Sequence, residues 1–185
     1  MNDETFWRIL EHSRTAAVKT LPDSPDEDAV FNAQIAALKE ELAAIEFHDV
    51  LSFDLIFQKK KIAAYRWNLW AVAYWLFGGC GDDSFSDFRS NLIGLGKADY
   101  EEALEDPDNL VETMTRPHLP YMLSEGFQNV ALDVYEERGG PPCQLDYPKY
   151  PDRPDGDDFD FDDTEEIARR YPRIVEKFPE SGAFF

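Results

Sequence analysis

A short segment that is apolar on every face constrains this chain most. Residues 65–89 read YRWNLWAVAYWLFGGCGDDSFSDFR, and within them Trp67, Trp70, Tyr74 and Phe77 recur at helical spacing. The residues between them are also largely apolar, which is typical of a helix buried in a protein core. The apolar run covers about a dozen residues, too few to cross the roughly 30 Å of a bilayer's hydrocarbon. The sequence therefore predicts a core helix rather than a membrane span.

Paired glycines follow this helix and separate it from a second one. Gly78 and Gly79 can adopt the left-handed backbone conformation that ends helices and that other residues resist. Beyond them, Phe85, Phe88 and Leu92 recur at helical spacing, which indicates a second amphipathic helix. We therefore expect a helix–turn–helix hairpin at the centre of the fold. Its expected core residues are Trp67, Trp70, Tyr74, Phe85 and Phe88.

The turn of this hairpin carries the best candidates for chemistry. Asp82 and Asp83 are adjacent carboxylates, and such a pair could hold a hard cation or act as acid and base if one were desolvated. Aspartate at a helix start more commonly caps the helix, and Arg89 or Arg66 could pair with it. Capping is therefore the simpler interpretation, and metal binding is the alternative. The candidate elbow comprises Gly78, Gly79, Cys80, Asp82, Asp83 and Arg89.

No other part of the sequence carries a recognised catalytic pattern. His12, His48 and His118 are scattered, and none has the spacing of a zinc site. Cys80 lies far in sequence from any histidine, and no Gly-x-Ser-x-Gly elbow is present. The sequence therefore gives no catalytic residue and implies no cofactor, and it favours a function other than catalysis.

The charge of the chain limits its partners. With 18 lysines and arginines against 38 aspartates and glutamates, the net charge is -20 and the isoelectric point is about 4.3. Such a chain is repelled by phosphate backbones and by anionic lipid, which argues against nucleic acid and membrane partners. The one basic cluster, residues 59–61, is expected to be a solvated helix face. A basic protein is a suitable partner, and the lack of a signal-peptide pattern in residues 1–10 predicts a cytoplasmic location.

The order of apolar and helix-breaking residues divides the chain into three parts. We expect one domain of about seven helices in residues 1–138, including a long amphipathic helix over residues 121–138. Residues 139–163, hereafter the arm, hold five prolines, and residues 152–166 carry nine acidic side chains against one arginine. Residues 164–185, hereafter the tail, are predicted to form a short helical segment that docks on the core. The predicted fold is an all-α, single-domain, multi-helix bundle with an irregular, acidic, proline-rich C-terminal arm.

A two-heptad apolar seam runs along one of the expected helices. Alternating spacings of four and three residues separate its members, Phe31, Ile35, Leu38, Leu42 and Ile45. A seam of this kind packs against another helix. The partner helix could come from the same chain or from a second copy, which leaves a homodimer open.

Several of these residues together resemble a known family. The pattern consists of an aromatic-rich helix, paired glycines, paired aspartates with a phenylalanine and an arginine, a helix ended by glycine, and a proline–aspartate turn. In this sequence its residues are Trp67, Leu69, Trp70, Gly78, Gly79, Asp82, Asp83, Phe85, Phe88, Arg89, Gly96, Pro107 and Asp108. The pattern is similar to that of a bacterial family catalogued as domain of unknown function 4240, over residues 4–135. The arm lies outside the resemblance, and Asn91 stands where relatives are expected to carry tryptophan. The resemblance implies a fold but no established activity.

Three functions remain to be compared with the structure. The leading hypothesis is a non-enzymatic, acidic protein-interaction module of bacterial origin. One form of this hypothesis is that its acidic surface neutralises a basic partner. One alternative is a metal-dependent hydrolase centred on Asp82 and Asp83, with His48 or glutamates of a neighbouring helix completing the site. This alternative requires those side chains to converge in one pocket. The other alternative is a structural homodimer formed through the seam of residues 31–45.

Overall fold

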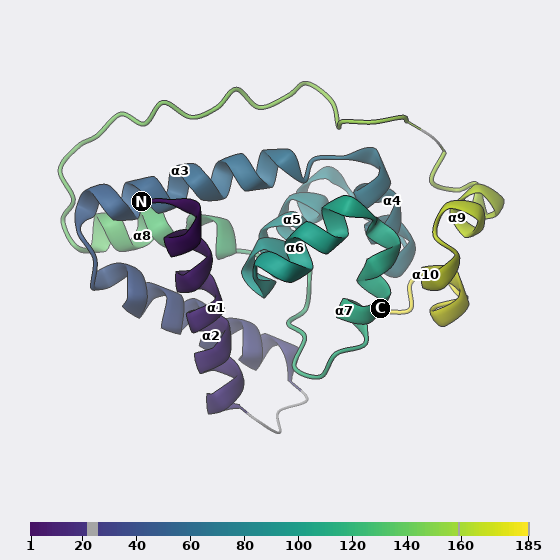
Figure 1. Ribbon diagram of the computed structural model, residues 1–185, viewed down its shortest axis with the longest axis horizontal. Coiled ribbons are helices and arrows are strands. Elements are labelled where there is room, and N and C mark those ends of the chain that lie inside the picture. The colour runs from purple at the N-terminus through teal and green to yellow at the C-terminus, as the bar shows by residue number, and fades with distance from the viewer. Residues whose placement is uncertain (22–25, 159, 185) are drawn as a thin grey trace.

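Helices dominate the structure, a computed structural model that describes residues 1–21, 26–158 and 160–184 (Figure 1). No β-strand occurs among these residues, although an isolated bridge joins Arg66 to Asp155. The all-α fold predicted from the sequence is therefore confirmed. Across the described part of the chain, none of the helices combines the length and the apolar character that a bilayer crossing requires. The elements in chain order are α1 (Asp3–Thr20), α2 (Glu27–Ala43), α3 (Phe47–Ala63), α4 (Trp67–Leu76), α5 (Asp82–Leu95), α6 (Lys97–Glu105), η1 (Pro107–Asn109), α7 (Leu110–Met114), η2 (Phe127–Asn129), α8 (Val130–Glu137), α9 (Thr164–Arg170) and α10 (Pro172–Lys177).

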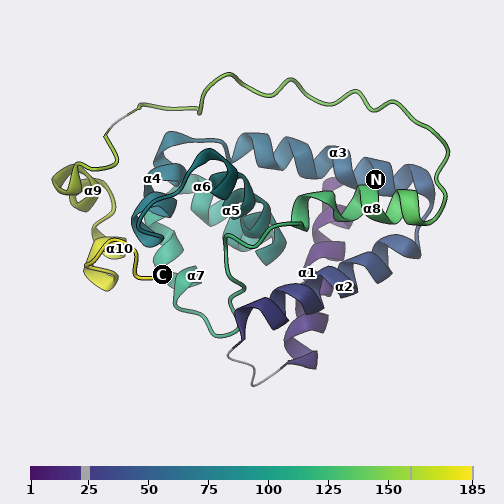
Figure 2. The same ribbon diagram turned by 180° about the vertical axis from the view of Figure 1, so that it is seen from behind.

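Helix α3 runs along one side of the molecule, next to the arm, and the other helices of the domain lie on its opposite side (Figure 1). Helices α1, α2 and α8 gather around its N-terminal half, where α1 packs on α2 and α8 packs on both α2 and α3. Helices α4 to α7 gather around its other end, and α5 joins the two groups through contacts with α1, α3 and α6. The arm runs along the outer side of α3 from one group to the other, and the tail lies at the far end (Figure 2).

Side-chain caps fix where several helices begin. Asn2 accepts the backbone N–H of Thr5 at the start of α1 (2.9 Å), and Asp26 accepts that of Ala29 at the start of α2 (3.0 Å). Asp163 caps α9 in the same way. Each such cap stabilises a helix by about 1 kcal/mol, because a first-turn N–H would otherwise lack a partner. These short polar side chains therefore set the boundaries that the apolar pattern leaves loose.

Aromatic rings make up much of the core, but the two helices of the central hairpin contribute differently. The phenylalanines predicted from α5 are fully buried, namely Phe85 and Phe88. The rings predicted from α4 are only partly buried, and Phe161 of the arm contacts all three, Trp67, Trp70 and Tyr74. The fully buried face of α4 is instead aliphatic, with Leu69, Val72 and Leu76. A residue far along the chain therefore covers the aromatic face of α4.

The apolar seam of α2 packs within the chain, where α2 contacts α1 and α8. Three of its residues are buried, Phe31, Leu38 and Leu42, and the other two are partly buried in the same core, Ile35 and Ile45. A seam buried in this way is not available to a second copy of the chain. A homodimer would therefore have to use another surface.

The helix expected over residues 121–138 is shorter than predicted. Residues 121–126 form turns, the short helix η2 follows, and α8 begins only at Val130. Gly126 has a left-handed backbone (φ 106°), which interrupts a right-handed helix. The buried amide of Asn91 also donates to two carbonyls of the turn segment (3.2 and 2.9 Å), and these bonds hold it as a loop. The prediction from apolar spacing was wrong here because it could not include these contacts.

Candidate functional site

The elbow predicted from the sequence joins α4 to α5 in a tight turn. Gly78 has a left-handed backbone (φ 62°) and directly follows the C-cap residue of α4. The N–H of Gly79 donates to the carbonyl of Tyr74 at 3.0 Å, and the N–H of Gly78 donates to that of Trp75 at 3.5 Å. This pair of bonds is the Schellman arrangement, which satisfies carbonyls that a helix end leaves without partners. The two glycines therefore serve the turn itself.

The two aspartates of the elbow lie in the first turn of α5 and are exposed. The capping position belongs to Gly81, and no side chain caps this helix. The capping interpretation of Asp82 and Asp83 is therefore wrong, because the helix begins at Asp82 and both aspartates lie inside it. Their negative charge still favours the helix through its dipole, whose N-terminal end is positive.

Other metal-binding side chains do not gather around the elbow carboxylates. Among the described residues, no group of three or more His, Cys, Asp or Glu side chains is placed to hold a metal ion. His48, the expected additional ligand, lies in the first turn of α3 and pairs with Asp49 (3.4 Å). The elbow lies beside the other end of α3, about 20 Å away along the helix. Metal binding at Asp82 and Asp83 stays a prediction that rests on these two carboxylates alone.

Arg89 lies beneath the elbow and is 1% exposed. Its guanidinium donates to the carbonyl of Phe85 through Nε (3.1 Å) and to that of Lys61, near the end of α3, through Nη1 (3.0 Å). The ring centroids of Tyr65 and Tyr150 lie 4.6 and 5.7 Å from its central carbon, at the distance of cation–π contacts. The carbonyl end of a helix carries partial negative charge, so Arg89 stabilises the junction of α3 and α5.

Cys80 combines a reactive residue type with a buried position. Burial raises the pKa of its thiol to about 12. At neutral pH the group is therefore a thiol and not the thiolate that attacks substrates or binds metals. Its backbone carbonyl accepts the indole N–H of Trp70 at 2.7 Å. Cys80 thus contributes to the packing of the turn.

A polar hollow of about 380 Å³ lies next to the elbow, lined by Asp83, Ser86, Asp87, Glu125, Gly126, Gln128 and Asn129. Lys61 is buried and donates to Oε1 of Gln128, so the expectation of a solvated lysine face is wrong for this residue. The reason is that this side of α3 packs against α5. Burial, and then the charge of Arg89, lowers the pKa of Lys61 to about 8. Burial, and then the charge of Glu125, raises the pKa of Asp87.

The arm crosses the outer side of α3 and is anchored at intervals. The hydroxyl of Tyr147 donates to Oδ2 of the buried Asp54 at 2.5 Å. The ring of Tyr150 packs on Tyr65, with 5.2 Å between the ring centroids. The backbone of Asp155 forms hydrogen bonds with the N–H of Trp67 (3.0 Å) and the carbonyl of Tyr65 (2.9 Å), where α4 begins. Between these anchors most of the arm is exposed.

The acidic side chains of the arm are presented to solvent. Every aspartate between residues 152 and 163 is exposed, namely Asp152, Asp155, Asp157, Asp158, Asp160, Asp162 and Asp163. Three of them also have structural roles, because Asp160 accepts the backbone N–H of Asp162 (3.0 Å), Asp162 accepts the hydroxyl of Tyr74 (3.1 Å) and Asp163 caps α9. The second half of the arm is therefore a strongly negative strip of surface.

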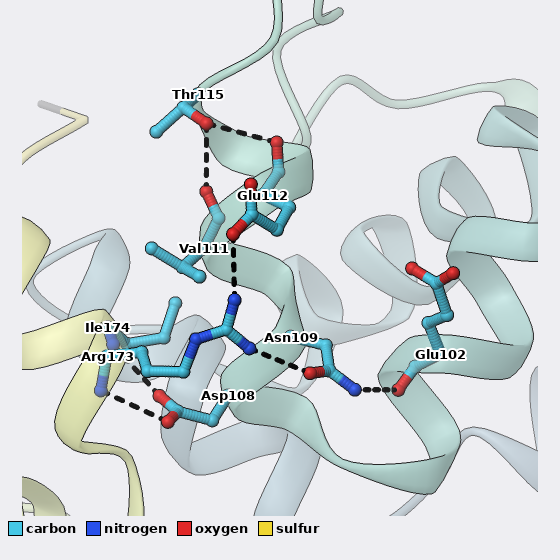
Figure 3. Close-up of polar contacts among 8 residues, drawn as sticks. All are labelled: Glu102, Asp108, Asn109, Val111, Glu112, Thr115, Arg173 and Ile174. Carbon is cyan, nitrogen blue, oxygen red and sulfur yellow. Dashed lines mark hydrogen bonds and ion pairs between the residues drawn. The ribbon is translucent and has the colours of Figure 1, made fainter.

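Three acceptors on η1 and α7 hold the tail, and we call them the tail site: Asp108, Asn109 and Glu112 (Figure 3). Asp108 is buried, and its two carboxylate oxygens accept the backbone N–H groups of Arg173 (3.1 Å) and Ile174 (2.9 Å) at the start of α10. The guanidinium of Arg173 donates to Asn109 Oδ1 (2.9 Å) and to Glu112 Oε1 (2.8 Å). Asn109 also donates to a carbonyl of α6 (3.3 Å), which orients its side chain.

Apolar burial and backbone hydrogen bonds complete the docking of the tail. Its buried apolar side chains are Ile167, Tyr171 and Ile174. The indole N–H of Trp75 donates to the carbonyl of Phe178 (2.8 Å), and the carbonyl of Trp75 accepts the N–H of Gly182 (2.9 Å). The tail therefore contacts α4, η1 and α7, which all precede the arm in the chain.

Sequence reasoning missed the tail site. The sequence indicates Asp108 only as part of a proline–aspartate turn, and nothing links that turn to Arg173, which follows 65 residues later. Asp54 was missed as well, because it lies on the apolar side of α3 next to Phe53. A polar residue on an otherwise apolar helix face is the one local signal that could have drawn attention to it.

Comparison with known proteins identifies a family but no individual relative. A family model described as "Protein of unknown function (DUF4240)" matches residues 1–137. No curated protein and no solved structure matches the chain. The matched residues contain the elbow and the tail site, whereas the arm and the tail lie beyond them. The tail site and the segment that occupies it therefore come from different parts of the chain.

Proposed function

The chain belongs to the DUF4240 family of proteins of unknown function, and we propose that it is a non-enzymatic interaction module that binds a basic protein through its arm. The observation that carries the proposal is the row of exposed aspartates between residues 152 and 163. A net charge of -20 adds long-range attraction for a basic partner. We expect this encounter to take place in the cytoplasm.

The arrangement of the arm suits contact with many basic groups at once. An exposed ion pair contributes only about 0.2–1 kcal/mol, so binding through charge needs several pairs. The arm is anchored by the backbone of Asp155 and by the cap of Asp163 on α9, and its carboxylates lie between and beside these points. Partial anchoring lowers the entropy that the arm would lose on binding. The arm can therefore supply several contacts at a modest ordering cost.

A labelled peptide rich in lysine and arginine provides a defined basic probe. Its binding, measured by fluorescence anisotropy, should weaken strongly as salt is added, because screening reduces the attraction between exposed charges. The arm variant carries three neutralised aspartates, Asp155→Asn, Asp157→Asn and Asp158→Asn. Its affinity at low salt should be about tenfold lower, at roughly 0.5 kcal/mol for each lost contact.

A control variant removes the same charge from other exposed positions, on α2 and α6, with Asp28→Asn, Glu40→Gln and Glu105→Gln. The control should bind the probe within about twofold of the wild-type chain, because the carboxylates of the arm are unchanged in it. Equal losses in the two variants would mean that only net charge matters and would contradict a role for the arm. Absence of wild-type binding at low salt would overturn the proposed function.

A further inference from the structure

The tail site recognises chemical features that another protein segment could also present. Asp108 contacts two backbone N–H groups, which any segment offers at the start of a helix. Within the tail, Asn109 and Glu112 form hydrogen bonds to the guanidinium of Arg173 alone. The side chain of Ile174 is fully buried behind these contacts. The site therefore selects an arginine followed by an aliphatic residue where a helix begins.

The geometry around the guanidinium favours arginine over lysine. Nη1 of Arg173 donates to Asn109 and Nη2 donates to Glu112, so that two nitrogens of one planar group reach two different residues (Figure 3). A lysine ammonium is a single point donor at the end of a flexible stem and cannot reproduce this fork. Because Glu112 is a carboxylate, the contact is also charge-assisted. The recognised segment is thus basic, like the partner proposed for the arm.

Recognition of another segment requires the tail to leave its site without unfolding the domain. The tail site lies within the matched residues 1–137, and the arm that carries the tail to it is largely exposed. Tethering through the arm gives the tail a high local concentration, on the order of millimolar for flexible linkers. A competing segment therefore needs an additional contact elsewhere on the same protein, and the carboxylates of the arm can supply it.

We propose that the tail site is a peptide-recognition site whose resident occupant is the tail. A basic partner displaces the tail by inserting a segment in which an arginine and an aliphatic residue follow one another at a helix start. The inference rests on the proposed function for the second contact, which the arm makes with the same partner. Displacement of the tail also frees one end of the arm, so that its carboxylates can follow the surface of the partner.

The test uses the full chain and a labelled synthetic peptide with the sequence of residues 164–184. In the variant Arg173→Glu, the tail presents a glutamate to Glu112, and repulsion between the two carboxylates should open the site. The peptide should bind this variant about tenfold or more tightly than it binds the wild-type chain, measured by fluorescence anisotropy. The matched control is Arg169→Glu, which makes the same charge change at an exposed position that pairs with Glu166 inside α9. It should bind the peptide as the wild-type chain does.

A charge-swapped pair keeps the test decisive if circular dichroism shows that the first variant folds poorly. The chain variant Glu112→Arg should bind a peptide that carries Arg173→Glu, and it should bind the unchanged peptide about tenfold more weakly. Equal affinity of the unchanged peptide for the wild-type, Arg173→Glu and Arg169→Glu chains would overturn the inference. A Glu112→Arg chain that does not discriminate between the two peptides would overturn it as well.

The two experiments distinguish failure of the recognition site from failure of the proposed function. The lysine-rich probe reports on the carboxylates of the arm, and the tail peptide reports on the tail site. If the tail peptide binds as expected but the lysine-rich probe does not bind, the proposed function is contradicted and the recognition site is supported. Binding of the probe without discrimination between peptides would remove the recognition site alone.

Discussion

The arm and the tail each contact a buried aspartate of the domain, but the two contacts differ in how completely they satisfy it. Asp108 meets the tail with both carboxylate oxygens, each of which accepts a backbone N–H. Asp54 meets the arm with one oxygen, which accepts the hydroxyl of Tyr147. Its other oxygen, Oδ1, is buried without a hydrogen-bond partner among the described residues. Burial accordingly raises the pKa of Asp54, while its contacts with Tyr147 and with the nearby amide of Gln58 act in the opposite direction.

Because of this difference, the contact of Asp108 should hold the tail more strongly than the contact of Asp54 holds the arm. A buried polar atom without a partner costs about 1–3 kcal/mol, which offsets what the hydrogen bond to Tyr147 contributes. Both oxygens of Asp108 accept charge-assisted hydrogen bonds, so no such cost arises there. We therefore expect a strongly anchored tail and a weakly held arm.

The largest effect is expected from Asp108→Ala. This change leaves two N–H groups at the start of α10 without acceptors, so the free energy of unfolding should fall by about 2–4 kcal/mol. Urea denaturation followed by tryptophan fluorescence measures the loss. Glu105→Ala, at an exposed position of α6, should change the stability by less than about 0.5 kcal/mol. A loss in Asp108→Ala as small as that of the control would show that the tail is not anchored at this residue.

A smaller effect of opposite sign is expected from Asp54→Asn. The amide keeps an acceptor for Tyr147 and carries no charge that burial would penalise. Stability at pH 7 should therefore rise by about 1 kcal/mol, measured by the same urea denaturation. A clear loss of stability would mean that the ionised carboxylate is well accommodated, and the contrast with Asp108 would then disappear.

The stability difference between Asp54→Asn and the wild-type chain should depend on pH, and the direction of this dependence tests whether burial penalises the ionised carboxylate. Because burial raises the pKa of Asp54, the folded chain binds this proton more tightly than the unfolded chain does. The resulting stability is fully present below the unfolded pKa and is lost as the pH rises through the folded pKa. The advantage of Asp54→Asn over the wild-type chain should therefore grow from acidic toward neutral pH. An advantage that stays constant over this range would contradict a raised pKa.

The elbow could be predicted from the sequence because its signals are local. Paired glycines at a helix end and phenylalanines at helical spacing lie close together in the chain, and Gly78 and Phe85 are placed as expected. The cap of the second helix was expected at Asp82 or Asp83 but lies at Gly81, because glycine and aspartate both suit a capping position. Local signals therefore predicted the hairpin but not the role of its aspartates.

The tail site could not be predicted because it joins segments that lie far apart in the chain. Asp108 and Arg173 are separated by 65 residues, and Asp54 and Tyr147 by 93. Periodicity describes which face of a helix is apolar but not which later segment will cover it. The prediction of a helix over residues 121–126 was wrong for the same reason, since the hydrogen bonds that hold these residues as a loop come from α5. Contacts of this kind override local propensity.

The smallest effect is expected from Tyr150→Ala in the arm. The Tyr150 side chain is 45% exposed and packs on one face of Tyr65, so the free energy of unfolding should fall by less than about 0.5 kcal/mol. The arm should nevertheless open more often, because this ring is one of its anchors. Trypsin should therefore cut after the exposed Lys149 about two- to fivefold faster than in the wild-type chain.

The comparison of cutting rate with stability decides whether the arm opens separately from the domain. The rate at which trypsin cuts each chain when it is unfolded in urea serves as a correction for the changed residue next to the cut. After this correction, the difference in cutting rate reports only how often the folded arm opens. Faster cutting at unchanged stability means that the arm lifts while the tail stays docked on Asp108. The alternative result is that the free energy of unfolding falls by more than about 1 kcal/mol and the cutting rate rises in proportion. The arm then belongs to the same cooperative unit as the core. In that case the tail could not leave its site without unfolding the domain, and the arm would be held as firmly as the core.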